Sequence, residues 1–317
     1  MAQYLSPISS GLGDLIVSLP AIQALIKTGE PTYLVMRSPY QYGLSDRIEG
    51  LAGSVREVDF NEENLANGDR HFNLRAHPLQ SDYVWGSIEF EEKYPGYKIN
   101  DVLRGICSDY GIAADFDNLA PFTSKRRPDC AGKTVFIPGS AGIVKCWPAS
   151  HWLELAERLE KQGHDVIVVG QTNNSPTVKQ LAEQGLELVD TPTLADALDV
   201  LSSAALAIGV DTGLMHLAVT QGIPTVGLFR YNTMFVRPYP HFRWLSAPLC
   251  PEECLNREYG DVPNKTITFD LWKENALSYW LTWTCAADEQ SQHCMSSITP
   301  DMVQETLSEI ATRKSIT

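Results

Sequence analysis

The most informative polar residues follow a buried apolar run at the point where a helix is expected to begin. Asp211, Thr212 and Gly213 come directly after that run, and His216 lies within one helical turn of them. Asp and Thr are helix-capping residue types, glycine allows close backbone approach, and a helix N-terminus carries partial positive charge that favours phosphate. The spacing therefore predicts an anion site that begins at Asp211.

A second group with similar character lies near the start of the chain. Gly11 and Gly13 precede Asp14 in a loop between an expected strand and a helix expected over residues 15–26. Such glycines allow a substrate to approach the backbone closely. An aspartate at this point can also cap the helix that follows, and both roles are compatible.

A lysine occupies the corresponding loop of the second half of the chain. Lys145 and Ser140 lie between a strand expected over residues 134–137 and a helix expected over residues 152–162. Open α/β sheets bind ligands beyond the carboxyl ends of their strands. We expect Lys145 to contact phosphate, the alternative being an ordinary solvated lysine, and Trp147 to pack in the core.

These residues are positioned by alternating strands and helices, which predict parallel, doubly wound sheets. The expected strands cover residues 4–8, 32–36, 134–137, 165–169, 186–189, 207–210 and 222–229. The expected helices cover residues 15–26, 102–110, 152–162, 177–183, 194–202 and 300–312, and a further helix begins at Asp211-Thr212-Gly213. Residues 61–73 are predicted to be a loop or irregular link, and residues 74–122 loops or short helices. After Phe229 the pattern dissolves. A basic, proline-containing break at residues 124–128 marks the expected domain boundary.

Composition limits the class of protein. A chain of 317 residues with 44% hydrophobic residues predicts two domains of ordinary size. A net charge of −14 argues against an extended nucleic-acid surface and leaves at most peripheral membrane contact. Neither a membrane span nor a signal peptide is recognisable, and seven scattered cysteines suit a reducing compartment. We therefore expect an acidic cytoplasmic enzyme.

Four stretches occur in order along most of the chain: Gly13-Asp14 with Ser18-Leu19-Pro20-Ala21-Ile22, Pro138-Gly139-Ser140-Ala141 with Lys145 and Trp147-Pro148, Asp211-Thr212-Gly213 with His216-Leu217-Ala218, and Cys294 with Ile298-Thr299-Pro300 and Val303. Together they resemble glycosyltransferase family 9, the heptosyltransferase-like group. The resemblance implies a GT-B fold of two Rossmann-like domains. It assigns residues 1–127 to acceptor binding, residues 128–297 to nucleotide-sugar binding, and residues 298–317 to a terminal helix that packs back toward the first domain.

The resemblance also implies an inverting transfer of a sugar, with ADP-heptose as the expected donor. The acceptor hydroxyl belongs to a lipopolysaccharide core, another glycan, a glycolipid or a protein. Such a transfer needs a base for the hydroxyl and cationic or N–H groups for the leaving diphosphate. Asp14 is the implied base, with Gly11 and Gly13 on the acceptor side, and the donor-binding residues are Ser140, Lys145, Asp211, Thr212, Gly213 and His216.

Two departures from the family pattern leave alternatives open. Ile137 stands where a histidine is common, and Cys146 where an arginine is common, so the phosphate site is expected to be less positive than usual. A nucleotide-sugar epimerase or isomerase on the same fold, or a non-catalytic nucleotide-sugar-binding subunit, are the competing functions. Arg75, His71, His77 and Arg104 are candidate acceptor contacts, with surface placement as the alternative for each.

Cysteines gather near the C-terminus. Cys250, Cys254, Cys285 and Cys294 could hold zinc or iron tetrahedrally, although their spacing matches no standard zinc motif. Buried or free thiols are the competing interpretation.

Overall fold

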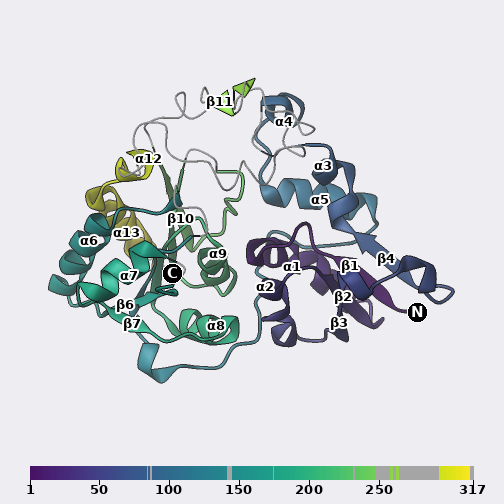
Figure 1. Cartoon of the computed structure of the whole chain (residues 1–317), viewed down its shortest axis with the longest axis horizontal. Helices are drawn as coiled ribbons and strands as arrows, with labels where there is room; N and C mark the ends of the chain where they lie inside the picture. Colours follow the sequence, from purple (N-terminus) through teal and green to yellow (C-terminus); the bar gives the residue numbers. More distant parts are fainter. Residues whose placement is uncertain are drawn as a thin grey trace.

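The computed structural model describes residues 1–83, 85, 88–140, 145–173, 175–230, 233–247, 258–259, 262–263 and 293–314. We call residues 1–121 the N-terminal half, residues 122–127 the linker, and residues 128–247 together with 293–314 the C-terminal half. Figure 1 shows the halves side by side, the first in purple and blue and the second in teal, green and yellow.

The N-terminal half is built on a parallel sheet. Its described strands are β1 (Gln3–Ser6), β2 (Thr32–Met36), β3 (Gly53–Arg56) and β4 (Arg70–Asn73), in the order β3-β2-β1-β4. Its helices are α1 (Leu12–Ile26), α2 (Pro39–Tyr42), α3 (Pro78–Ser81), α4 (Ile88–Lys93) and α5 (Ile99–Asp109), with short 3-10 turns η1 (Ser45–Arg47), η2 (Glu57–Asp59), η3 (Glu62–Asn64) and η4 (Leu74–Ala76).

The C-terminal half contains a larger parallel sheet. Its described strands are β5 (Thr134–Ile137), β6 (Val166–Val169), β7 (Glu187–Val189), β8 (Leu206–Val210), β9 (Thr225–Phe229) and β10 (Phe242–Ser246), in the order β10-β9-β8-β5-β6-β7. Its helices are α6 (Ala149–Lys161), α7 (Pro176–Glu183), α8 (Leu194–Ser203), α9 (Gly213–Thr220), α12 (His293–Ser296) and α13 (Pro300–Lys314), preceded by η5 (Pro128–Cys130). A separate pair, β11 (Glu258–Tyr259) and β12 (Val262–Pro263), is antiparallel. Among the described residues, no helix combines the length and apolarity needed to cross a bilayer.

Local sequence explains these elements. The central strands of the second sheet are mostly apolar, and every residue of β5, β6 and β9 is buried, as expected for a parallel sheet covered on both faces. In α6 the buried residues Trp152, Leu155, Ala156 and Leu159 recur at helical spacing and form one face. Helix α8 begins with a capping box in which Thr193 and Asp196 satisfy each other's backbone amides.

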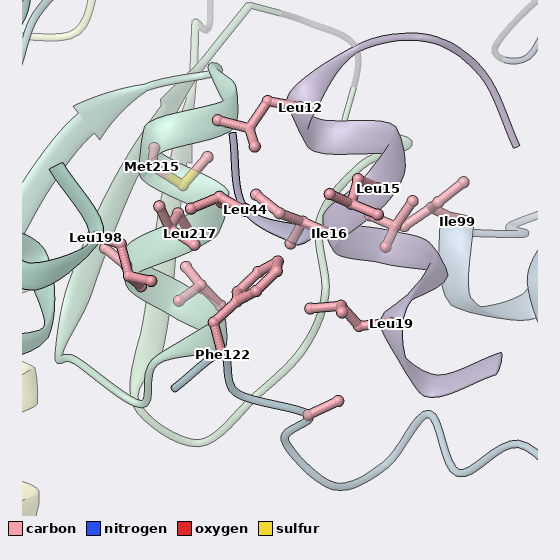
Figure 2. Packing of buried hydrophobic residues seen from close by; sticks show 14 of the residues in the cluster. Leu12, Leu15, Ile16, Leu19, Leu44, Ile99, Phe122, Leu198, Met215 and Leu217 are labelled. Atoms are coloured by element: carbon pink, nitrogen blue, oxygen red, sulfur yellow. The ribbon is translucent and has the colours of Figure 1, made fainter. Parts of the chain in front are cut away.

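The two halves meet through α1 and α9, which pack against each other. Figure 2 shows Leu12 and Ile16 of α1 on the side of Met215 and Leu217 of α9, with Phe122 of the linker below them and Leu15 on the side of Ile99. These residues belong to one buried cluster that extends across both halves. A Cβ atom added at Gly213 would lie 2.9 Å from Leu12 Cβ, so the start of α9 touches the start of α1 with no room for a side chain.

Several expectations are confirmed and others are wrong. The strands at residues 32–36 and 134–137 have the expected bounds, whereas β4 lies in the stretch expected to be irregular and β10 in the segment after Phe229 where no strand was expected. Helix α1 begins at Leu12 rather than Leu15. We expected the terminal helix to pack back toward the first domain. The described contacts of α13 are instead with α6, β9 and β10 of the C-terminal half. Its apolar side chains belong to the core cluster of the second sheet.

The close approach of α1 and α9 gives a stability prediction. The substitution Gly213→Ala should lower the free energy of unfolding by about 1–3 kcal/mol, because the new methyl group overpacks the contact with Leu12. Urea denaturation measures the change. Gly13→Ala is the matched control, since its Cβ would meet only His216 Cδ2, at an ordinary 3.9 Å. Equal effects of the two substitutions would contradict the proposed crowding at Gly213.

Candidate active site

Asp14 occupies the first turn of α1 and closes that turn on itself. Its Oδ2 atom accepts a hydrogen bond of 2.7 Å from the amide of Gly11, the N-cap residue. Because an acidic side chain at the third helical position satisfies the N-cap amide, the helix begins before Asp14 and not after it. Gly13, expected in the loop, is therefore a helical residue, and the expectation that Asp14 caps a helix beginning at Leu15 is wrong in position: Asp14 contributes to the cap from inside the first turn, with Gly11 as the N-cap residue.

Three hydrogen bonds from the Ser18 and Gln41 side chains hold the backbone around the start of α1. The Ser18 hydroxyl donates to the Asp14 carbonyl at 2.7 Å and accepts from the Ile8 amide at 3.3 Å. The buried Gln41 side chain donates to the Ser9 carbonyl at 2.7 Å. These bonds fix the backbone that carries Asp14, as a catalytic group requires.

The carboxyl group of Asp14 has a raised pKa. Burial raises the pKa of its carboxyl group, and the Gly11 amide, Arg75 and Lys145 lower it less, so the pKa is about 6. Arg75 belongs to η4 and donates to the Ser9 carbonyl at 3.5 Å, while it pairs with Glu57. A carboxyl group with this pKa changes protonation near neutral pH, which suits a general base.

Three polar residues of the C-terminal half form a connected set. Lys145 Nζ donates to Asp211 Oδ2 at 2.7 Å, and His216 Nε2 lies 3.2 Å from Asp211 Oδ1. Burial opposes the ionised form of Asp211, but Lys145 and His216 outweigh it and hold its pKa well below the ordinary value. Asp211 therefore remains ionised and holds both neighbours. Lys145 keeps 30% of its side chain exposed, so it can reach a ligand.

His216 is buried on α9. Burial lowers the pKa of its imidazole more than Asp211 raises it, so the ring is neutral near pH 7. Its ring packs near Phe229 and Phe235. The buried Arg237 donates to the His216 carbonyl at 2.8 Å and fixes that part of the helix.

The contact of α1 with α9 brings Asp14 and the Lys145, Asp211 and His216 set together. Gly13 faces the His216 ring, and Lys145 acts electrostatically on Asp14. Thr212 is the N-cap residue of α9, and no bond from the first turn to its hydroxyl is among the described contacts. A carboxylate that can take a proton thus lies beside a lysine and a helix N-terminus.

Other residues singled out from the sequence have varied positions. Ser140 follows β5. The Ser140 backbone and the Thr177 side chain each form a hydrogen bond with the buried Cys146 thiol. Ile137 is also fully buried, so neither Ile137 nor Cys146 presents its side chain to a ligand. Trp147 is buried, as expected, and its indole donates to the Ile298 carbonyl at 2.7 Å.

Of the four candidate acceptor contacts, Arg75 is the one whose charge lowers the pKa of Asp14. His71 pairs with Glu62 and the Ser6 hydroxyl, His77 with Asp109, and Arg104 with Asp101 and Asp117.

Sequence reasoning missed Gln41, Glu57 and Arg237. Strand β4 was not recognised, and its sequence Arg70-His71-Phe72-Asn73 holds a single apolar residue, so little in this stretch indicated the position of Arg75.

The cysteine hypothesis falls mostly outside the described residues. Cys250, Cys254 and Cys285 are not described, and Cys294 is buried in the core of the second sheet. Within the described part of the chain, no three side chains of metal-binding type come together.

Comparison with known proteins gives the class. The family model of glycosyltransferase family 9 (heptosyltransferase) matches residues 108–244. Lipopolysaccharide heptosyltransferase 1 of Pseudomonas aeruginosa is 30% identical over 280 residues, which cover 84% of this chain and 69% of that protein. The crystal structure of a family 9 glycosyltransferase from Veillonella parvula matches with a TM-score of 0.68 at 16% identity, over 98% of this chain and 97% of the other.

The Escherichia coli heptosyltransferase WaaC, solved with ADP-2-deoxy-2-fluoro heptose, matches with a TM-score of 0.61 at 14% identity, over 98% of this chain and 99% of that one. The fold is GT-B, the two-domain α/β architecture of many glycosyltransferases. The chain belongs to glycosyltransferase family 9, the heptosyltransferase family, and is a glycosyltransferase enzyme.

Burial of Asp14 predicts a pH-dependent cost in stability. Its folded-state pKa of about 6 lies above the ordinary 3.8, so the folded state binds more protons between these values and stability falls as the pH rises through them. At pH 7.5, above both pKa values, the ionised carboxylate destabilises the fold by about 3 kcal/mol. Asp14→Asn should recover that amount at pH 7.5 and almost none at pH 4, as measured by urea denaturation.

The exposed Asp82 in the same half provides the control, since Asp82→Asn should change stability little at either pH. An equal gain from Asp14→Asn at both pH values would show that ionisation of Asp14 is not the cause.

Proposed function

We propose that this chain transfers heptose from ADP-heptose to a hydroxyl group of the lipopolysaccharide core, with inversion at the anomeric carbon. The observation that carries the proposal is the meeting of Asp14 with the Lys145 and Asp211 ion pair at the facing N-termini of α1 and α9. The 30% identical Pseudomonas aeruginosa relative named lipopolysaccharide heptosyltransferase 1 supports the acceptor class. The ADP-heptose analogue named with the WaaC structure supports the donor class.

In the proposed reaction the acceptor hydroxyl gives its proton to the Asp14 carboxylate. The hydroxyl oxygen forms a bond to the anomeric carbon of the donor sugar while the bond from that carbon to the phosphate oxygen breaks. Attack on the face opposite the leaving group inverts the anomeric configuration. The tight bond from Gly11 keeps the Asp14 carboxylate in one orientation for this step.

ADP leaves with additional negative charge on its terminal phosphate, which the C-terminal half must stabilise. Lys145 supplies a cation whose remaining N–H groups can donate to phosphate, and the first amides of α9 after Thr212 supply partial positive charge. Gly213 keeps that helix end free of a side chain. Ser140 lies at the end of β5, on the same edge of the sheet, and is the remaining proposed donor contact.

Asp211 and His216 act in this proposal through their neighbours. Asp211 holds Lys145 in place, and the neutral His216 orients the second oxygen of Asp211. Arg75 is the residue of the N-terminal half whose positive charge lowers the pKa of Asp14, and we assign it to acceptor-side positioning.

Nucleotide binding tests the donor site. Calorimetric titration with ADP, UDP, GDP and CDP should show a preference for ADP, and Lys145→Ala should weaken ADP binding by about tenfold to a hundredfold through loss of a charge-assisted hydrogen bond. Lys133→Ala is the matched control, because Lys133 pairs with Asp165 and Glu187 on a distant edge of the same half. Absence of binding by every diphosphate would overturn the proposed donor site.

The pH dependence of transfer tests the base. With ADP-heptose and a lipopolysaccharide-core acceptor, kcat/KM should rise with pH through about 6 and then level off, as Asp14 loses its proton. Asp14→Asn should lower kcat by about 10²–10⁴-fold while ADP still binds. Asp82→Asn serves as control. An epimerase or isomerase would instead convert the nucleotide sugar without acceptor, and a non-catalytic subunit would bind ADP without turnover.

A further inference from the structure

A second, polar contact joins the two halves away from the facing helix N-termini. Arg47 of η1 lies in the N-terminal half, and Asp199 lies on α8 of the C-terminal half. Arg47 Nη2 donates to Asp199 Oδ2 at 2.9 Å, and the two side chains are only 17% and 9% exposed. The adjoining α2 segment is also close to α8, since a Cβ at Gly43 would lie 3.2 Å from Leu194 Cδ1.

Arg47 and Asp199 also form hydrogen bonds with the linker. The second oxygen of Asp199 accepts from the Lys125 amide at 2.7 Å, and the Arg47 carbonyl accepts from the Thr123 amide at 2.7 Å. Gln221, at the end of α9, accepts from the Phe122 amide at 2.8 Å and donates to the Phe122 carbonyl at 3.1 Å. One ion pair thus joins the N-terminal half, the linker and the C-terminal half.

The apolar α1 and α9 contact and the Arg47 and Asp199 ion pair differ in what they can specify. A further polar contact between the halves runs from the Ile99 amide to the Met234 carbonyl at 2.9 Å. The α1 and α9 contact buries apolar side chains, and apolar attraction has little directional preference, so it defines the angle between the halves less sharply than a hydrogen-bonded ion pair does. An arginine and carboxylate pair has a defined geometry and a buried position, so it opposes a turn of one half against the other. A turn of that kind would displace Asp14 relative to Lys145, because they belong to different halves.

We propose that the Arg47 and Asp199 ion pair is a positioning element that sets the angle between the two halves and thereby places Asp14 against the donor-binding residues Lys145 and Asp211. This inference rests on the proposed function for its catalytic consequence. It assigns Arg47 and Asp199 to alignment of the reacting groups, with no contact to substrate.

The test uses the full chain with Arg47→Met, Asp199→Asn and the double variant. Each single variant should lower kcat by about tenfold, because a displacement of about 1 Å between reacting groups has a large effect on rate. The Kd for ADP should stay within about twofold, since the nucleotide site lies in the C-terminal half. The double variant should be no slower than the slower single variant, because both substitutions remove one interaction. Asp199→Asn retains an acceptor for the Lys125 amide.

Hydrogen exchange provides a measurement that does not depend on activity. The amides of Phe122, Thr123 and Lys125 should exchange at least about threefold faster in both single variants. Arg70→Met is the matched control, because it removes the Arg70 and Glu30 pair within the N-terminal half alone and should change neither kcat nor linker exchange.

Lower kcat with unchanged ADP affinity and faster linker exchange supports the proposal. Unchanged kcat and exchange, an equal loss of ADP affinity, or additive effects in the double variant overturns it. If the unmodified chain transfers no sugar from any donor, the proposed function fails, and linker exchange alone then decides the positioning role: faster exchange supports it and unchanged exchange overturns it. If Asp199→Asn does not fold, Arg47→Met carries the same measurements.

Discussion

The packing of α1 on α9 is the contact on which the arrangement of this protein depends. Asp14 belongs to the N-terminal half, whereas Lys145 and the start of α9 belong to the C-terminal half, so the proposed site exists only where α1 and α9 begin side by side. Gly213 permits that approach because any side chain would meet Leu12. The buried apolar cluster behind the helix ends supplies the attraction that keeps them together.

The surroundings of two carboxyl groups near this contact shift their pKa values in opposite directions. Asp14 is desolvated, and the hydrogen bond from the neutral Gly11 amide and the charges of Arg75 and Lys145 offset this only in part, so its pKa is raised to about 6. Asp211 is also desolvated, but it is directly bonded to Lys145 and His216, so its pKa is held low. The first can therefore exchange a proton near neutral pH, whereas the second stays ionised and organises its neighbours. Such a separation of pKa values is how acid–base roles are divided within one site.

Much of the fold, and most residues of the candidate site, could be predicted from the sequence. The buried strands β2 and β5 were recognised with their bounds because apolar, β-branched runs have few alternatives. Strands β4 and β10 were missed because both lie at sheet edges and are partly exposed, which breaks the apolar run. The start of α1 was misplaced because Asp14 closes the turn from within the helix rather than from its N-cap.

The sequence by itself determined the family, the two parallel sheets and the identity of the polar residues at the strand ends, because these follow from local periodicity and short motifs. Only the tertiary structure decided that Asp14 faces the Lys145 and Asp211 pair, that Arg75 rather than His71, His77 or Arg104 acts on it, and that α13 stays with the second sheet. These relations join residues far apart in the chain through packing between halves. No local pattern encodes such contacts, since the same motifs could be held at many angles.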